Sequence, residues 1–184
     1  MRAAIDTSSL LMLVRYYLPF EKNDKLRKLI EKKLNSGELI IIDKVHEEAK
    51  YQSKGIILKE LDFLNEKSKH IKTSSILPDA KFISQLENQL CYGAQKNRLT
   101  PVEFEVAKNK FLDTADAKLI IYCDKEKNAM IDKPILVTEE SRSENDSKLF
   151  KKLPEICDLL SIEHCNLPTL LKTHFGIKLS DYLE

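Results

Sequence analysis

Short segments that are apolar at every position, separated by longer stretches with helical periodicity, constrain the fold of this chain more than any other feature. Leu39–Ile42 is four apolar residues in a row, and residues 3–5 and Pro134–Val137 repeat the pattern. Strands without polar alternation are typical of a parallel sheet covered on both faces. Residues 162–165 are a candidate for one more short strand. We therefore predict an α/β fold, a three-layer α/β/α sandwich around a central parallel sheet of about four to five short strands.

Apolar residues at helical spacing, together with capping signals, predict the helices between these strands. Ser8 or Ser9 is expected to cap a helix over residues 10–17. Thr100 and Glu103 form a capping-box pattern around a proline at the first helical position. Further helices are predicted over residues 24–34, 44–49 (capped by Asp43), 56–64, 79–90, 101–111, 115–122, 154–160 and 167–175.

Composition indicates an ordinary globular protein. A length of 184 residues suits a single domain, residues 1–184, that buries roughly 70% of its unfolded surface without needing a disulfide or a structural metal. The net charge of +1 gives no global field that would attract nucleic acid. Residues 71–76 show no assignable pattern, and residues 141–147 are expected to be the least ordered.

Cysteine usage and hydropathy point to the cytoplasm. The four cysteines lack zinc-ligand or C-x-x-C spacing, so we expect reduced thiols; they are Cys91, Cys123, Cys157 and Cys165. The N-terminal residues lack the pattern of a signal peptide, and no apolar run is long enough to span a membrane. We expect a cytoplasmic protein without a membrane partner.

Four acidic residues follow the predicted strands. Asp6 ends the first strand, and Glu48 lies one to two turns into the helix after the second. Asp116 lies in the first turn of a helix, and Glu140 follows the third strand. The carboxyl ends of parallel strands meet at one edge of a sheet, so these side chains should converge. Converging carboxylates repel one another, and a divalent cation with a preference for oxygen ligands, Mg²⁺ or Mn²⁺, would remove that conflict.

Each acid also has an ordinary structural interpretation. Asp6 alone is more typical of a helix cap than of a ligand, and Asp113 or Thr114 could cap the following helix. Glu48 alone would belong to a solvated helix face, and Glu140 alone to surface charge. The functional interpretation depends on the recurrence of acids after strand ends.

In this order, the motifs resemble those of the PIN-domain family of metal-dependent nucleases. The resemblance spans about residues 3–165, and the segment from 153 to 177 looks like a subgroup of uncharacterised bacterial and archaeal PIN proteins. The matching pieces are residues 5–10, 45–49, 113–120 and 135–140.

The resemblance implies a site. Asp6, Glu48, Asp116 and Glu140 match the family's metal-binding catalytic acids, with Mg²⁺ or Mn²⁺ as cofactor. Residues expected to orient carboxylates or contact substrate are Thr7, Ser8, Asp113, Thr138 and Arg142. Two departures stand out: position 140 is Glu where the family usually has Asp, and the insertion between Glu48 and Asp116 is longer than in the smallest PIN toxins.

The implied activity is hydrolysis of RNA phosphodiester bonds, that is, a metal-dependent endoribonuclease. The implied partners are an RNA substrate, an antitoxin if the chain is the toxin of a toxin–antitoxin pair, and a second copy of the chain. The alternative is a catalytically weak or inactive PIN fold that binds RNA or protein. A phosphoryl-transfer domain with Asp6 as nucleophile is a weaker alternative, because position 8 is Ser8 where a second Asp would be expected. Basic residues after the fourth acid could meet a phosphate backbone or simply be solvated: Arg142, Lys148, Lys151 and Lys152.

Overall fold

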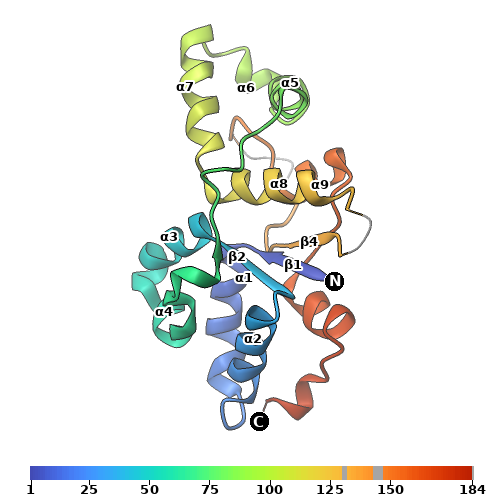
Figure 1. Cartoon of the computed structure of the whole chain (residues 1–184). Helices are drawn as coiled ribbons and strands as arrows, with labels where there is room; N and C mark the ends of the chain where they lie inside the picture. Colours follow the sequence, from blue (N-terminus) through green and yellow to red (C-terminus); the bar gives the residue numbers. More distant parts are fainter. Residues whose placement is uncertain (130–131, 143–146, 184) are drawn as a thin grey trace.

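A computed structural model describes residues 1–129, 132–142 and 147–183. At its centre is a five-stranded parallel sheet with the strand order β3-β2-β1-β4-β5 (Figure 1). The strands are β1 (Arg2–Ile5), β2 (Leu39–Ile42), β3 (His70–Ile71), β4 (Pro134–Val137) and β5 (His164–Cys165). The predicted α/β class and the parallel sheet are confirmed.

The central strand β1 marks the point at which the strand order reverses. The chain first builds outward from β1 through β2 to β3, and then returns to place β4 and β5 on the other side of β1. Ala3 and Ala4 of β1 are fully buried, and Ala3 pairs with Leu39 on one side and Ile135 on the other. In open α/β sheets, ligands bind outside the carboxyl ends of the strands at such a switch point, here between β1 and β4.

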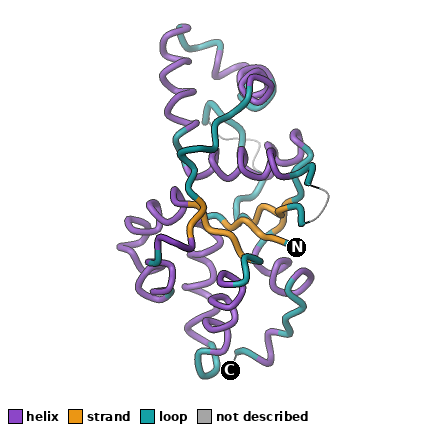
Figure 2. The backbone as a smooth tube through the Cα atoms, viewed as in Figure 1, coloured by secondary structure: helices purple, strands orange, loops and turns teal. Residues whose placement is uncertain are grey.

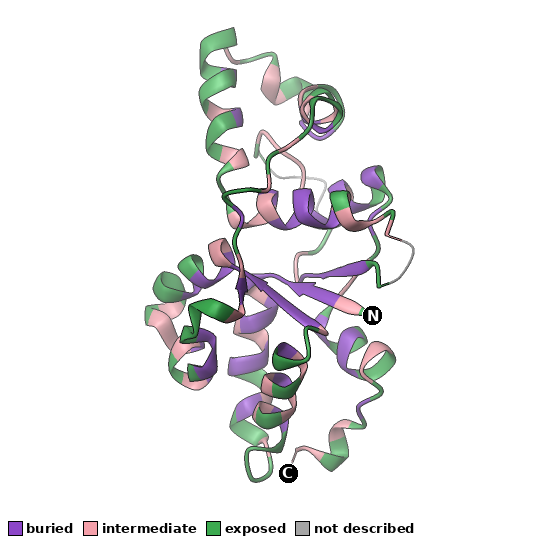
Figure 3. Ribbon diagram, viewed as in Figure 1, coloured by how far each residue is buried: buried purple, intermediate pink, exposed green. Residues whose placement is uncertain are grey.

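Helices cover both faces of the sheet. α8 (Ala115–Glu126) and α9 (Leu153–Leu160) lie on one face, and α1 (Thr7–Met12) and α2 (Lys25–Asn35) lie on the other (Figure 1). The strands and the inward sides of these helices are buried (Figure 3). The three-layer α/β/α arrangement follows from strands that are apolar at every position and therefore need cover on both faces.

Further helical elements complete the layers. α3 (Asp43–Tyr51) and α4 (Ile56–Glu60) pack against α1. The remaining short elements are η1 (Leu13–Tyr17), η2 (Leu18–Phe20), η3 (Gln52–Gly55), η4 (Asp62–Asn65), η5 (Lys67–Lys69), α10 (Leu167–Thr169), η6 (Leu170–His174) and η7 (Leu179–Asp181).

The insertion forms an arm that extends beyond α8, away from the sheet (Figures 1 and 2). It contains α5 (Ala80–Asn88), α6 (Gly93–Lys96) and α7 (Pro101–Leu112). The arm is tied to the segment before α9, because Tyr92 N–H donates to Leu149 O at 2.9 Å and Lys151 N–H donates to Leu90 O at 3.0 Å. Segments distant in the sequence therefore lie side by side.

Several local predictions are confirmed. Thr100 and Glu103 form the capping box at the start of α7, and Pro101 is its first residue. Asp79 caps α5 by accepting a hydrogen bond from the Phe82 N–H. The predicted third strand has the predicted bounds.

The predicted cap of the first helix is wrong. The helix begins at Thr7, and Asp6 is its N-cap, so neither Ser8 nor Ser9 holds that position. Asp6 has the extended backbone conformation that an N-cap requires because it continues directly from β1. The hydroxyl of Ser9 is buried and has no partner among the described residues. The predicted helix over residues 10–17 continues α1 as the π-helical η1.

Two further predictions need correction. Asp43 is the first residue of α3 and not its N-cap, and its carboxylate accepts hydrogen bonds from the Thr73 N–H and hydroxyl at 3.0 and 2.6 Å. Residues 71–76, which showed no assignable pattern, begin with the second residue of β3, a strand whose two residues are too few for a sequence pattern. Most of the stretch expected to be least ordered, residues 143–146, lies outside the described residues.

In the part of the chain that the structure describes, none of the helices is long and apolar enough to cross a membrane. All four cysteines are free, as predicted, and three of them are buried.

Candidate functional site

Asp6 lies at the switch point and is held by hydrogen bonds from three residues. The Ser9 N–H donates to Oδ1 at 2.7 Å, while the hydroxyls of Ser8 and Thr138 donate to Oδ2 at 2.7 and 2.6 Å. Asp6 and Thr138 are each only 3% exposed. Thr138 directly follows β4, so the network joins the carboxyl ends of the two neighbouring strands β1 and β4.

Glu48 reaches the same edge from α3. The hydroxyl of the buried Thr7 donates to Glu48 Oε2 at 2.6 Å. The neighbouring Glu47 is instead 3.8 Å from the ammonium of Lys44. Of the two adjacent glutamates, the one that the PIN resemblance selects is therefore the one bonded to the first turn of α1.

Asp116, in the first turn of α8, has a strongly perturbed carboxyl group. Burial, the largest cause, raises its pKa from 3.8 to about 7, and the charges of Glu140, Glu48 and Asp6 add to the rise. The ammonium of Lys148 acts in the opposite direction. No hydrogen bond reaches the Asp116 carboxylate from the residues that the structure describes. Its charge is therefore the least compensated of the four predicted acids.

The two glutamates after β4 bind helix N-termini. Glu140 Oε2 accepts a hydrogen bond from the Leu153 N–H at the start of α9, at 2.9 Å. Glu139 Oε1 accepts one from the Leu167 N–H at the start of α10, at 2.6 Å. The extra methylene of glutamate therefore gives position 140 a structural contact, and Thr138 supports it by accepting from the Glu140 N–H at 3.1 Å.

Asp113 does not join the acids. It is exposed and forms an ion pair with Lys44 at 2.8 Å. The alternative left open by the sequence is resolved in favour of Thr114, which caps α8 by accepting from the Ala117 N–H at 3.2 Å.

Arg142 lies near Glu140, and both line the same pocket. Arg142 forms an ion pair with Asp158 of α9. Together with Thr138 and Glu140 it lines a second pocket of about 390 Å³, so it is near the site but held by a different acid.

The charges of Asp6, Glu48 and Glu140 thus all act on Asp116. Within residues 1–129, 132–142 and 147–183, however, no three acidic, histidine or cysteine side chains are arranged closely enough to hold a metal ion. Asp6, Glu48 and Glu140 are each held by hydrogen bonds, which fix where their carboxylates lie.

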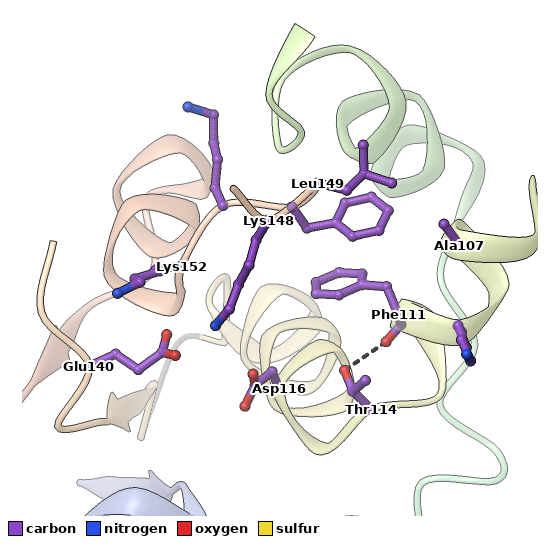
Figure 4. A pocket seen from close by; sticks show the side chains of 11 residues that line it. Ala107, Phe111, Thr114, Asp116, Glu140, Lys148, Leu149 and Lys152 are labelled. Atoms are coloured by element: carbon purple, nitrogen blue, oxygen red, sulfur yellow. Dashed lines mark hydrogen bonds between the residues drawn. The ribbon is translucent and has the colours of Figure 1, made fainter. Parts of the chain in front are cut away.

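A pocket of about 340 Å³ opens beside Asp116 and Glu140 (Figure 4). Lys148 points toward the space between these two carboxylates, and Phe111 and Leu149 lie at the opposite end (Figure 4). The full lining comprises Ala107, Lys110, Phe111, Thr114, Asp116, Glu140, Lys148, Leu149, Phe150, Lys151 and Lys152.

The sequence pointed to three lysines of this pocket, Lys148, Lys151 and Lys152, but gave no signal for Lys110 or for the apolar wall. Phe111 and Phe150 stack with ring centroids 4.3 Å apart and planes inclined by 23°. They come from α7 and from the segment before α9, which only the packing of the arm brings together.

Comparison with curated proteins finds no match, and neither does comparison with solved structures. A family model described as "Domain of unknown function (DUF4411)" matches residues 4–175, almost the whole chain, so the protein belongs to this family.

Proposed function

We propose that the protein is a Mg²⁺- or Mn²⁺-dependent endoribonuclease that hydrolyses RNA phosphodiester bonds. The proposal rests on one observation above all. The half-buried Asp116 lies near the switch point of the sheet, where desolvation and the charges of Glu140, Glu48 and Asp6 raise its carboxyl pKa to about 7. Strongly perturbed acids in such a position are candidates for a functional site.

The donor chemistry fits a hard divalent cation. Asp116 receives no hydrogen bond from the described residues, and a nearby positive ion would offset the repulsion that raises its pKa. Asp6 keeps acceptor capacity, because each carboxylate oxygen has two lone pairs. Asp6 and Asp116 would hold the ion, with Glu48 and Glu140 at its periphery. A bound ion of this kind activates a water molecule and stabilises the charge that builds on a phosphodiester.

The remaining roles belong to the chain's own side chains. Ser8 and Thr138 orient Asp6, and Thr7 orients Glu48, so the acids keep their positions while a charged substrate approaches. Lys148 and Lys152 line the adjoining pocket and would bind phosphate groups of the RNA.

A second candidate function is a PIN-like fold that binds RNA without cutting it. It is favoured by the bond between Glu140 and the Leu153 N–H, which uses this carboxylate for a structural purpose. The absence of a three-residue metal group among the described residues favours it too. This alternative predicts RNA binding that does not depend on divalent metal.

The cellular setting that accompanies the proposal comes from the PIN resemblance. In this setting we propose that the chain is the toxin of a toxin–antitoxin pair and acts in the cytoplasm. Its protein partners would be an antitoxin and a second copy of the chain. Four free cysteines are compatible with a reducing compartment. Co-purification of the product of a small neighbouring gene would test the toxin role.

Cleavage of labelled RNA in the presence of Mn²⁺ tests the enzymatic proposal. We expect Asp116→Asn to lower the cleavage rate by more than about 100-fold, because it removes an acid of the proposed metal site. Asp113→Asn is the matched control, since Asp113 is an exposed acid near the same helix start and is paired with Lys44. A chelator should abolish cleavage by the wild type. Identical products and rates from the wild type and Asp116→Asn would overturn the proposal.

A further inference from the structure

We infer that the pocket beside Asp116 and Glu140 is a nucleobase-binding subsite, which takes up one unpaired base of the RNA while a neighbouring phosphate lies at the acids. This inference rests on the proposed function and deepens it. It assigns a role in substrate selection to the arm that the insertion forms.

The pocket has two chemically different halves. Ala107, Phe111, Leu149 and Phe150 form the apolar half. Carboxylates and lysines form the other half, with Lys148 reaching toward the acids (Figure 4). A nucleotide matches both halves, because its base has apolar faces and its phosphate is anionic. The volume of about 340 Å³ is near the lower end of the range for ligand pockets, about 300–1,000 Å³, which suits one nucleotide.

The aromatic wall is held in place before any ligand arrives. Phe150 stacks on Phe111 at 4.3 Å and lies 6.4 Å from Phe104 in a tilted arrangement. An antiparallel bridge between Cys91 and Phe150 fixes the backbone of this segment to the arm. A fixed aromatic surface loses little conformational entropy when a base packs against it.

Charge around the pocket matches a polyanionic chain. Lys110, Lys148 and Lys152 line it, and Lys148 points toward the space between the carboxylates of Asp116 and Glu140 (Figure 4). Lys151 lines the pocket too, and it forms an ion pair with Glu155. The lysines would hold the phosphates on either side of the inserted base.

The geometry implies selectivity for unpaired RNA. A base in an A-form duplex is stacked and paired, and proteins that read individual RNA bases take them from single-stranded segments. Entry into this pocket therefore requires a base that is already unstacked. Stacking on phenylalanine is tolerant of base identity. The affinity should therefore depend more on whether a base is present than on which base it is.

Fluorescence anisotropy with a labelled single-stranded RNA tests the inference. The measurement compares an intact oligoribonucleotide with the same strand carrying abasic sites, in the presence of a chelator so that nothing is cleaved. Phe150→Leu removes an aromatic ring, and Ala107→Leu fills the pocket without removing any packing. Phe20→Leu is the matched control, because Phe20 is 59% exposed and does not line the pocket.

We expect the wild type to bind the intact strand at least about 10-fold more tightly than the abasic strand. Phe150→Leu and Ala107→Leu should each reduce that difference severalfold, while Phe20→Leu should leave it unchanged. Thermal unfolding of each variant shows whether a loss reflects misfolding, and Ala107→Leu keeps the test decisive if Phe150→Leu is unfolded.

The outcomes separate the subsite from the nuclease proposal. Equal affinity for intact and abasic strands, together with Mn²⁺-dependent cleavage, would overturn the subsite alone. Base-dependent binding without cleavage would overturn the nuclease proposal and leave the subsite standing. Failure to bind either strand, together with no cleavage in the presence of Mn²⁺, would overturn both.

Discussion

Two aspartates on the same edge of the sheet have opposite surroundings. Asp6 is buried, and both of its oxygens accept hydrogen bonds, from Ser8, Ser9 and Thr138. Asp116 receives no hydrogen bond from the described residues, and burial and neighbouring charges raise its pKa to about 7. Asp6 is therefore part of what holds the strands and α1 together, whereas the ionised form of Asp116 opposes folding. In the proposed metal site, Asp6 would supply a ligand of fixed position and Asp116 the uncompensated negative charge.

The largest expected effect is a loss of stability on substitution of Asp6. Asp6→Ala should lower the free energy of unfolding by about 3 kcal/mol, because it removes a helix cap and leaves the buried Thr138 hydroxyl and the half-buried Ser8 hydroxyl without their acceptor. Asp79→Ala removes the equivalent cap of α5, where the carboxylate accepts only from the Phe82 N–H, and should lower it by about 1 kcal/mol. Urea denaturation measures both. Equal losses in the two variants would mean that Asp6 is an ordinary cap.

Substitution of Asp116 is expected to raise the free energy of unfolding, whereas substitution of Asp6 lowers it, and the increase should depend on pH. The carboxyl pKa is higher in the folded state, about 7, than the ordinary value of 3.8, so the folded protein retains the proton between these values. Stability therefore falls as pH rises from about 4 to above 7, since folding must then accommodate the charged form. Asp116→Asn removes this penalty and should stabilise the metal-free protein by about 2 kcal/mol at pH 8, and by nothing at pH 4. The full shift would correspond to about 4 kcal/mol, and partial exposure of the side chain reduces it.

Urea denaturation with a chelator at pH 4 and pH 8 measures this difference. Asp113→Asn serves as the control, because the hydrogen bond and charge of Lys44 lower the pKa of Asp113. That substitution should give a small effect of opposite sign. If Asp116→Asn leaves stability unchanged at pH 8, the contrast between the two aspartates is wrong.

The surroundings of Asp6 can be predicted from the sequence better than those of Asp116. Apolar strands at residues 3–5, Leu39–Ile42 and Pro134–Val137 predict a parallel sheet, and topology then brings Asp6 and Thr138 to one edge. The prediction that Ser8 or Ser9 caps α1 is wrong because Asp and Ser are both good N-caps. Only the extended backbone of Asp6 after β1 decides between them.

The rest depends on long-range packing. The two residues of β3 give no periodicity, so they could not be assigned from sequence. Phe111 and Phe150 meet only because the backbone of the arm pairs with the segment before α9. The hydrogen bonds of Glu139 and Glu140 to two different helix N-termini likewise become visible only in the structure.

The smallest effect is expected at the hydroxyl that orients Glu48. Thr7→Val keeps the shape of a buried side chain and removes the donor that is 2.6 Å from Glu48 Oε2. Glu48 is exposed and can bond to water instead, so we expect a loss of about 1 kcal/mol in stability and a decrease of about 10-fold in Mn²⁺ affinity. Isothermal titration calorimetry measures the affinity. Thr138→Val is the matched comparison, and because its hydroxyl donates to the buried Asp6, it should lower both quantities more than Thr7→Val does. Equal losses of stability and Mn²⁺ affinity in the two variants would show that the exposed Glu48 is held as firmly as Asp6. Asp116 would then be the one acid of the three whose surroundings differ.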